Sequence, residues 1–348
     1  MFAFLRPYIF TLDPEAAHDL AIKSLRFNFM PKNFFQVENE EMLSTKLFKK
    51  KLKNPIGLAA GFDKSAEVYN SLFKLGFGFV EVGTITPKRQ LGNPKPRVFR
   101  LEKDKALINR LGFNNDGLET VSERLKKNAP KEFLGINIGP NKDTKDKILD
   151  FLECFSKLNK FASYITVNIS SPNTIGLRDF HEEKLLSELL GKLLELKKNN
   201  KIACPIALKL SPDIKEDEIT NINEIILKFK IDGLILTNTT NQNRENLLDG
   251  SKSEIGGLSG KPLTKLSLKF IKNFYKSNKG KIPIIGVGGI DSGQSAFEKI
   301  AAGASVIQLY TGMVYKGPGI VKDIKKELIA ILKREKIKNI QQAVGINS

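Results

Sequence analysis

The stretch that decides the fold is Tyr164-Ile165-Thr166-Val167-Asn168-Ile169-Ser170-Ser171-Pro172-Asn173-Thr174. Its first four residues form a short apolar run, typical of a buried strand. Hydrogen-bonding side chains then surround a single proline, and such a loop at a strand end can present donors and acceptors to a ligand. Taken alone, Ser-Pro-Asn is also ordinary turn chemistry. The rest of the chain decides between these two interpretations.

The same pattern of an apolar run, a polar or glycine-rich tip and a helical stretch repeats along the chain. Strands are predicted at 56–60, 79–82, 133–138, 164–167, 206–210, 234–236, 282–287 and 306–309. Helices are predicted near 64–74, 116–127, 143–159, 181–199, 215–229, 263–276, 292–302 and 319–334. This alternation predicts an α/β fold, a closed (β/α)8 TIM barrel. The alternative is an open doubly wound sheet, but none of the runs resembles an edge strand.

Two connections are too long for simple turns. The segment 84–115 is predicted to make an excursion above the barrel, and 239–260 is a predicted lid.

A barrel carries its chemistry at the carboxyl ends of its strands, and polar or glycine residues follow every predicted strand. These tips are Ala60 to Lys64, Gly83-Thr84, Asn137 to Gly139, Asn168 to Asn173, Lys209, Thr237 to Thr239, Gly286 to Gly289 and Tyr310 to Gly312. The last two tips follow the seventh and eighth strands, where barrels commonly bind phosphate through backbone N–H groups. The sequence therefore predicts a ligand that bears a phosphate.

Length and composition limit the function classes. The 348 residues suit one barrel with additions, and the net charge of +18 admits nucleic acid, anionic lipid or small anions as partners. The lysines are scattered over predicted helices and cluster only at 49–53, so we expect a solvated surface and no nucleic-acid partner. Cys154 and Cys204 lie in apolar contexts and predict neither a disulfide framework nor a metal site. We expect no signal peptide and no membrane-spanning helix.

The first 40 residues are rich in apolar and aromatic side chains. Asp13-Pro14 is a good helix start, and Ala17, Leu20, Ala21 and Leu25 follow at helical spacing within 15–29. Two short amphipathic helices are therefore predicted. They would either cover the barrel or a dimer contact, or form a platform on a membrane surface.

Taken together, these motifs resemble the dihydroorotate dehydrogenases of the quinone-linked, membrane-associated class, from residue 1 to about residue 335. The motifs are Ala60 to Lys64, Asn109 to Asn115, Asn168 to Thr174, Lys209, Thr237 to Thr239, Ser259 to Leu263, Gly288-Gly289 and Tyr310-Thr311. The resemblance implies a helical extension over 1–40 that gives access to membrane and quinone, and a catalytic barrel over 41–348 that binds flavin mononucleotide (FMN).

The resemblance also assigns ligands to residues. The implied FMN site comprises Ala60, Gly61, Thr84, Asn137, Asn168, Lys209, Thr237, Gly260, Gly289, Tyr310 and Thr311. The implied dihydroorotate site comprises Lys64, Asn109, Arg110, Leu111, Gly112, Phe113, Asn168, Asn173, Asn238 and Thr239. These residue types suit their ligands, because a cation and amide side chains can recognise a carboxylate and ring amides.

The chemistry implied by the resemblance is oxidation of dihydroorotate to orotate in pyrimidine biosynthesis. Ser171 is the expected base, with Thr174 as a direct or water-mediated relay partner, and Lys209 would stabilise negative charge on the flavin. In the soluble classes of this family the base is a cysteine. Serine at position 171 and the added amino-terminal segment therefore both favour the quinone-linked class.

Quinone is expected to enter between the helices of 1–40, near His18 and Arg100, although a helical histidine also suits a surface or capping role. The resemblance further implies a monomer bound peripherally to an anionic membrane, on the cytoplasmic side of the inner membrane. Two alternatives stay open. One is a flavin barrel that uses a nicotinamide cofactor or fumarate as oxidant. The other is a basic lipid- or nucleic-acid-binding protein without flavin, whose binding would depend strongly on salt.

Overall fold

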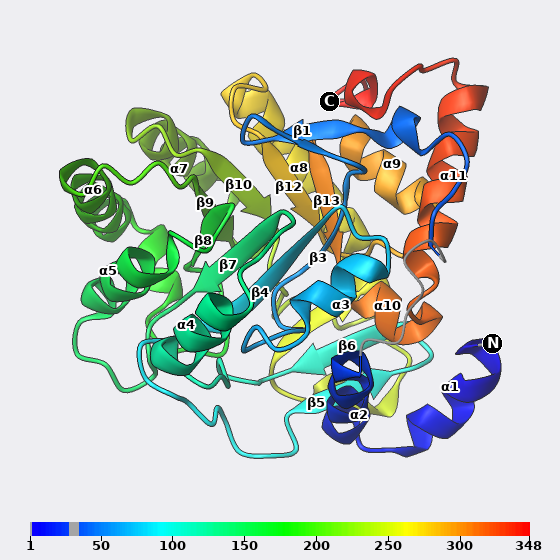
Figure 1. Cartoon of the computed structure of the whole chain (residues 1–348), viewed down its shortest axis with the longest axis horizontal. Helices are drawn as coiled ribbons and strands as arrows, with labels where there is room; N and C mark the ends of the chain where they lie inside the picture. Colours follow the sequence, from blue (N-terminus) through cyan, green and yellow to red (C-terminus); the bar gives the residue numbers. More distant parts are fainter. Residues whose placement is uncertain (1, 28–34) are drawn as a thin grey trace.

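Parallel strands close into a barrel at the centre of the computed structural model, which describes residues 2–27 and 35–348 (Figure 1). In spatial order the barrel strands are β3 (Ile56–Leu58), β4 (Phe79–Ile85), β7 (Leu134–Ile138), β8 (Tyr164–Asn168), β9 (Ile206–Leu210), β10 (Gly233–Leu236), β12 (Ile284–Val287) and β13 (Val306–Leu309). Strand β13 pairs with β3, with Leu309 opposite Leu58, and this pairing closes the barrel. The predicted barrel is confirmed, and the open sheet is excluded.

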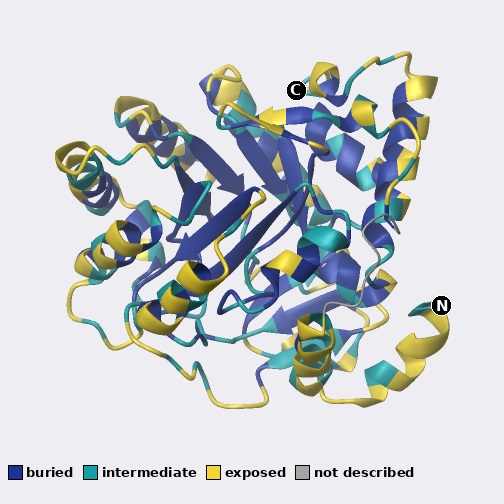
Figure 2. Cartoon of the chain, viewed as in Figure 1, coloured by how far each residue is buried: buried dark blue, intermediate teal, exposed yellow. Residues whose placement is uncertain are grey.

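Helices surround the barrel and turn their exposed faces outward (Figure 2). They are α3 (Tyr69–Lys74), α4 (Leu118–Lys127), α5 (Lys147–Leu158), α6 (Glu183–Asn199), α7 (Glu216–Lys228), α8 (Thr264–Asn278), α9 (Gly293–Ala301) and α11 (Ile320–Arg334). Helix α3 begins five residues later than predicted, because the Asp63 carboxylate accepts hydrogen bonds from the N–H groups of Glu67 and Val68 and holds a turn there. Helix α10 (Thr311–Lys316) was not predicted, since six residues are too few to show a helical period.

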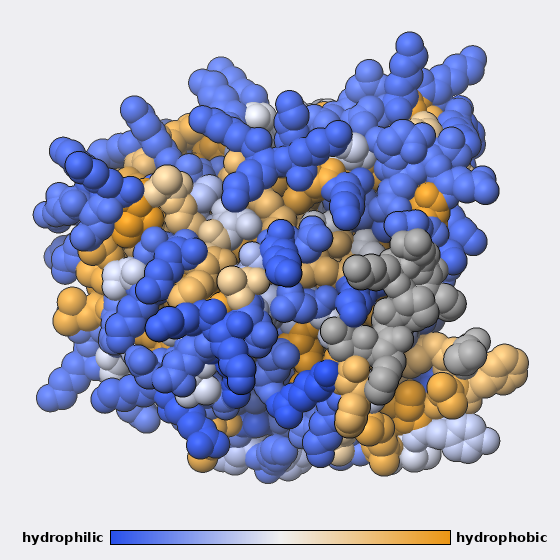
Figure 3. Space-filling view, in the orientation of Figure 1, coloured by the Kyte–Doolittle hydropathy of each residue, from blue (hydrophilic) through white to orange (hydrophobic). Residues whose placement is uncertain are grey.

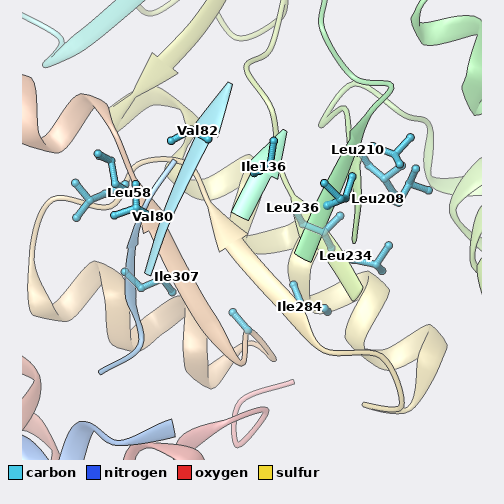
Figure 4. Packing of buried hydrophobic residues seen from close by; sticks show 14 of the residues in the cluster. Leu58, Val80, Val82, Ile136, Leu208, Leu210, Leu234, Leu236, Ile284 and Ile307 are labelled. Carbon is cyan, nitrogen blue, oxygen red and sulfur yellow. The ribbon is translucent and has the colours of Figure 1, made fainter. Parts of the chain in front are cut away.

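Alternation along the strands separates two parts of the core. In β4, Val80 and Val82 belong to the layer between barrel and helices, whereas Phe79 belongs to a separate cluster with Tyr164 inside the barrel. Figure 4 shows part of the outer layer, including Val80 and Val82. Phe79 and, two positions on, Glu81 therefore point into the barrel interior.

The amino ends of the strands are covered by a hairpin of β1 (Thr45–Leu47) and β2 (Lys50–Leu52). Leu47 and Leu52 pack into the Phe79 cluster, and the Phe48 ring lies 5.3 Å from the ring of Tyr164. The lysine cluster 49–53 belongs to this hairpin and to the residue that follows it.

The two long connections join above the carboxyl ends. Strands β5 (Val98–Leu101) and β6 (Ala106–Asn109) come from the first connection, and β11 (Gly257–Gly260) comes from the second; together they form an antiparallel sheet. The predicted excursion is thus confirmed, and the predicted lid segment is anchored to it through β11. The 3-10 helices are η1 (Glu40–Leu43), η2 (Arg178–His181), η3 (Gly250–Ser253), η4 (Lys261–Leu263) and η5 (Ile340–Ala343).

The amino-terminal segment forms α1 (Phe2–Thr11) and α2 (Pro14–Arg26), as predicted. Asp13 caps α2 by accepting hydrogen bonds from the N–H groups of Glu15 and Ala16. The predicted end of this helix at 29, and positions 1 and 28–34 of the predicted extension, lie outside the described residues.

Large apolar side chains on α1 and α2 face the surroundings. Phe4 and Tyr8 are 81% and 76% exposed, and Figure 3 shows hydrophobic atoms gathered over α1 at the lower right. Among the described residues, no helix is long and apolar enough to cross a membrane.

Candidate active site

A cavity of about 340 Å³ lies at the carboxyl ends of the barrel strands. Its walls come from the strand tips, the β5–β6 and β11 layer, and Arg6 and Phe10 of α1. The predicted site residues that line it are Ala60, Gly61, Lys64, Thr84, Asn109, Leu111, Gly112, Phe113, Asn168, Ser171, Asn173, Lys209, Thr237, Asn238, Thr239, Gly260, Gly289, Tyr310 and Thr311. The fold therefore brings together residues that are up to 251 positions apart in the chain, from Ala60 to Thr311.

The side chain of Arg110 lies outside this lining. Its guanidinium donates to the Glu254 carboxylate at 2.7 Å and to the Ile255 carbonyl at 3.0 Å, and it stacks 4.6 Å from the Phe99 ring centroid. Arg110 therefore fastens the 239–260 segment to the excursion and does not point into the cavity.

Thr174 is also outside the cavity lining, although it is buried. The Ser171 hydroxyl oxygen accepts a hydrogen bond from the N–H group of Asn173 at 3.2 Å, and no hydrogen bond joins Thr174 to Ser171 in the described part of the chain. The relay through Thr174 stays a prediction, and it requires a bridging water.

Asn137 lies below the cavity and supports two residues that line it. Its Oδ1 accepts hydrogen bonds from Thr84 Oγ1 at 2.7 Å and from Asn168 Nδ2 at 3.1 Å. Its own Nδ2 donates to the Glu81 carboxylate at 2.8 Å. The strand tips of β4, β7 and β8 are thus held in one fully buried hydrogen-bond network.

Glu81 is the buried acceptor at the base of this network, and sequence reasoning missed it. Besides Asn137 it accepts hydrogen bonds from the Tyr164 hydroxyl at 2.8 Å and Gln308 Nε2 at 2.9 Å. Burial raises the pKa of Tyr164 well above its ordinary value, so this phenol remains a donor to the carboxylate. An acidic residue inside an otherwise apolar strand run was the available signal.

Two lysines bring positive charge to the cavity. Lys209 on β9 is buried, and in the described part of the chain its ammonium group makes neither a hydrogen bond nor an ion pair. Burial lowers the pKa of Lys209, and the Glu81 carboxylate opposes this shift. Lys64 Nζ lies 3.1 Å from His18 Nε2 of α2, and burial lowers the pKa of Lys64 to about 8. Both cations can therefore face a bound anion.

The loop after β12 presents backbone donors. Gly288 and Gly289 have φ angles of +112° and +73°, and their N–H groups donate to no atom of the described protein. A Cβ at Gly289 would lie 2.0 Å from Thr264 Oγ1, so this close approach needs glycine. Free N–H groups beside Tyr310 and Thr311 fit a phosphate, and Lys209 fits the anionic side of a reduced flavin ring. The residues present therefore fit FMN.

The cavity also reaches the amino-terminal helices. Arg6 donates to the Tyr315 carbonyl, the Phe10 ring lies 5.5 Å from the Tyr315 ring, and the Arg100 guanidinium stacks 4.6 Å from Phe10. His18 packs edge-on against Phe62 at 5.0 Å. Burial and then Lys64 lower the pKa of His18 to about 3, so its imidazole is neutral. Arg100 and His18 lie behind the cavity wall and join the extension to the barrel.

The dihydroorotate dehydrogenase family model matches residues 42–332. The chain belongs to the dihydroorotate dehydrogenase family. Curated members at high similarity carry the name dihydroorotate dehydrogenase (quinone), which confirms the predicted resemblance to the quinone-linked class.

Similar dihydroorotate dehydrogenases cover nearly the whole chain. The mitochondrial quinone enzyme of Mus musculus is 45% identical over 97% of this chain and 87% of its own length. The Christiangramia forsetii quinone enzyme is 46% identical over 94% of this chain and 98% of its own. The Eimeria tenella dihydroorotate dehydrogenase, solved in complex with ferulenol, is 40% identical with a TM-score of 0.92 and covers 96% of both chains. Since each match leaves no more than 6% of the chain uncovered, at least part of the extension over 1–40 is included in these similarities.

Proposed function

We propose that this dihydroorotate dehydrogenase oxidises (S)-dihydroorotate to orotate with a quinone as acceptor, through FMN, in de novo synthesis of UMP. The observation that carries the proposal is one cavity that joins the glycine loop, Ser171, Lys209 and the helix α1. The quinone relatives support the acceptor.

FMN would be held at the strand tips. The N–H groups of Gly288 and Gly289 would bind its phosphate, and Thr84, Asn168 and Lys209 would contact its ring system. When bound, FMN would supply a two-electron acceptor for the hydride that leaves C6 of dihydroorotate and a donor for the reduction of quinone. Because Asn137 holds Thr84 and Asn168 from below, these two side chains would already be oriented when the ring binds.

Dihydroorotate would bind between Lys64 and the cavity-lining amides. The Lys64 ammonium would pair with its carboxylate, and Asn109, Asn173 and Asn238 would bind its ring amides. The ammonium group has three N–H donors, so it can bind the carboxylate while one of them stays on His18 Nε2.

Ser171 would remove the proton from C5. Its hydroxyl lines the cavity and is oriented by the N–H group of Asn173, which leaves oxygen lone pairs to accept a proton. The hydroxyl proton must leave as the C5 proton arrives, so a water is needed between Ser171 and its onward acceptor. Lys209 would stabilise the negative charge that hydride transfer delivers to the cavity.

Quinone would enter from the extension, residues 1–40, and reach the barrel, residues 41–348. The cavity lining by Arg6 and Phe10 supports this route. The exposed Phe4 and Tyr8, together with the net charge of +18, support peripheral binding to an anionic membrane. We place the protein, as a monomer, on the cytoplasmic side of the inner membrane.

A panel of electron acceptors tests the proposed function. The FMN-loaded protein would receive dihydroorotate and, in separate assays, a short-chain quinone, NAD⁺ or fumarate. We expect sustained orotate formation, over many turnovers, with quinone and with no other acceptor of the panel. Equal or faster turnover with NAD⁺ or fumarate would contradict the acceptor, and no orotate with any acceptor would contradict the reaction.

A further inference from the structure

Two neighbouring strands of the barrel end in the same type of turn. Ser171-Pro172-Asn173 follows β8, and Ser211-Pro212-Asp213 follows β9. In each turn the serine hydroxyl oxygen accepts a hydrogen bond from the N–H group two residues later, at 3.2 Å for Ser171 and 3.1 Å for Ser211. Because Asn168 of β8 pairs with Lys209 of β9, the turns lie side by side.

The turns differ in what they face. Ser171 lines the cavity, whereas Ser211 is buried and lies outside the lining. The residue that ends the second turn, Asp213, has a carboxylate where the first turn has the amide of Asn173. The second turn therefore carries a fixed negative charge beside the turn that holds Ser171.

That charge is paired with Arg178, at the start of η2. The guanidinium donates to Asp213 Oδ2 at 2.9 Å, and it also donates to the Ser170 carbonyl and the Thr239 carbonyl, at 3.3 Å each. A planar guanidinium can serve three acceptors in fixed directions, which a lysine ammonium on a flexible stem does not reproduce. Arg178 thus joins the loops that follow β8, β9 and β10.

Asp213 completes the same connection from its other side. Its carboxylate accepts hydrogen bonds from the Thr240 hydroxyl and from the N–H group of Asn241, the latter at 3.0 Å. Both partners stand at the start of the 239–260 segment. The side chains of Arg178 and Asp213 are 25% and 10% exposed, so their charge-assisted hydrogen bonds are partly shielded from water.

Both the backbone and the side chain of Ser170 are therefore fixed by hydrogen bonds. Its carbonyl accepts from Arg178, while its hydroxyl donates to Asn168 Oδ1 at 2.9 Å and accepts from Asn238 Nδ2 at 2.9 Å. Ser171 is the next residue. The position of its hydroxyl over the cavity therefore depends on a backbone that Arg178 fixes from outside.

We propose that Arg178 and Asp213 are positioning residues that hold Ser171 in its reactive place. The proposal rests on the proposed function, because it takes Ser171 as the base. Neither residue lines the cavity, so neither touches the substrate. They affect the reaction by positioning Ser171, and an experiment can distinguish this effect from a general loss of structure.

The test combines Arg178→Gln with Ser171→Ala in a double-mutant cycle on FMN-loaded protein. The readouts are the limiting rate at which saturating dihydroorotate bleaches the flavin bands, the orotate dissociation constant from the flavin spectrum, and FMN content. Arg178→Gln is expected to lower the limiting rate roughly 10- to 100-fold, the cost of a displacement near 1 Å, with little change in orotate affinity. In the Ser171→Ala background it is expected to cause no further loss.

Lys197→Gln is the matched control. Lys197 pairs with Asp232 at 3.1 Å, and the Lys197 side chain is about as exposed as that of Arg178, at 20% against 25%. Asp232 lies in the connection just before β10, at the amino ends of the strands. This variant should keep the wild-type rate. Asp213→Asn is a second test, needed if Arg178→Gln folds poorly. It removes the negative charge of the pair with little change in shape, and it should lower the limiting rate with little change in orotate affinity.

The outcomes separate the inference from the function on which it rests. A wild-type rate for Arg178→Gln or Asp213→Asn would overturn the positioning role, and so would an equal loss in the presence and absence of Ser171. If Ser171→Ala itself reacts as fast as wild type, the base assignment fails and the positioning role fails with it.

Discussion

The two ends of this barrel are built from different chemistry. At the amino ends Leu47 and Leu52 of the hairpin close over Phe79 and Tyr164, and the rings of Phe79 and Phe133 pack at 6.5 Å. At the carboxyl ends, within the described part of the chain, backbone donors and the Lys209 ammonium have no protein partner, and they lie at a cavity of about 340 Å³. One end buries apolar surface and the other end leaves polar groups for a ligand.

The difference separates stability from activity. Apolar packing at the amino ends stabilises the barrel, since burying such side chains is the main favourable term in folding. At the carboxyl ends the Lys209 ammonium and the N–H groups of Gly288 and Gly289, which have no partner among the described residues, would gain partners when ligands bind. Changes at the two ends should therefore affect different measurements, and the predictions below state how.

Ser171→Ala should give the largest effect, at the carboxyl end. Loss of a general base lowers the rate by roughly 10²- to 10⁴-fold, so flavin bleaching by dihydroorotate should slow by that factor. The thermal midpoint should fall only slightly, because among the described residues the side chain takes part in one hydrogen bond, from the N–H group of Asn173. Stopped-flow absorbance measures the bleaching rate, and thermal denaturation measures the midpoint. A large fall in the midpoint would show that the carboxyl end also determines stability.

Phe79→Ala should lower the stability of the protein and leave ligand binding unchanged. Its ring is fully buried at the amino end, and truncation of a buried phenylalanine costs about 3–5 kcal/mol of unfolding free energy. Orotate affinity of the folded fraction should be unchanged. Chemical denaturation and orotate titration measure the two, and weakened orotate binding would show that the amino-end packing controls the site.

Gly289→Ala should weaken FMN binding. The left-handed φ of +73° and the contact with Thr264 oppose a Cβ, and the conformational cost of about 1–2 kcal/mol would be relieved by moving the loop. The FMN dissociation constant, measured by fluorescence quenching, should rise about tenfold, since 1.4 kcal/mol is a factor of ten. Gly191→Ala on α6, with only Phe229 near its Cβ at 3.8 Å, is the control and should bind FMN normally.

Orotate binding should weaken in alkaline solution. The pKa of Lys64 is lowered by burial to about 8, and its charged form predominates below that pH. Since the carboxylate of orotate binds the charged form, the dissociation constant should rise about tenfold between pH 7 and pH 9. Lys64→Met should bind more weakly and lose this dependence. A pH dependence that survives in Lys64→Met would assign the titration to another group.

Much of the fold followed from local pattern. The runs at 206–210 and 306–309 match β9 and β13, because a buried parallel strand is apolar on both faces and ends at a polar tip. The hairpin β1–β2 was missed, since Thr45–Leu47 and Lys50–Leu52 are only three residues each and lysines surround them. Helix α10 was missed for the same reason of length.

Some residues of the site could be predicted from the sequence and others could not. Residues at strand tips, such as Lys209 and Asn238, reach the cavity because tip position fixes their direction. Arg110 belongs to the same motif as Asn109, yet a long side chain can turn toward Glu254 instead. Arg178 and Asp213 gave no periodic signal. The repeated Ser-Pro-Asx turn was the one available sign, and only the closed barrel shows that the two turns adjoin.

The most direct test of the central claim is the visible spectrum of the FMN-loaded protein under anaerobic conditions, as dihydroorotate and then a short-chain quinone are added. We predict that the flavin bands bleach with dihydroorotate and return with quinone. Bands that persist after dihydroorotate would contradict the substrate. Bands that bleach but do not return with quinone would contradict the acceptor.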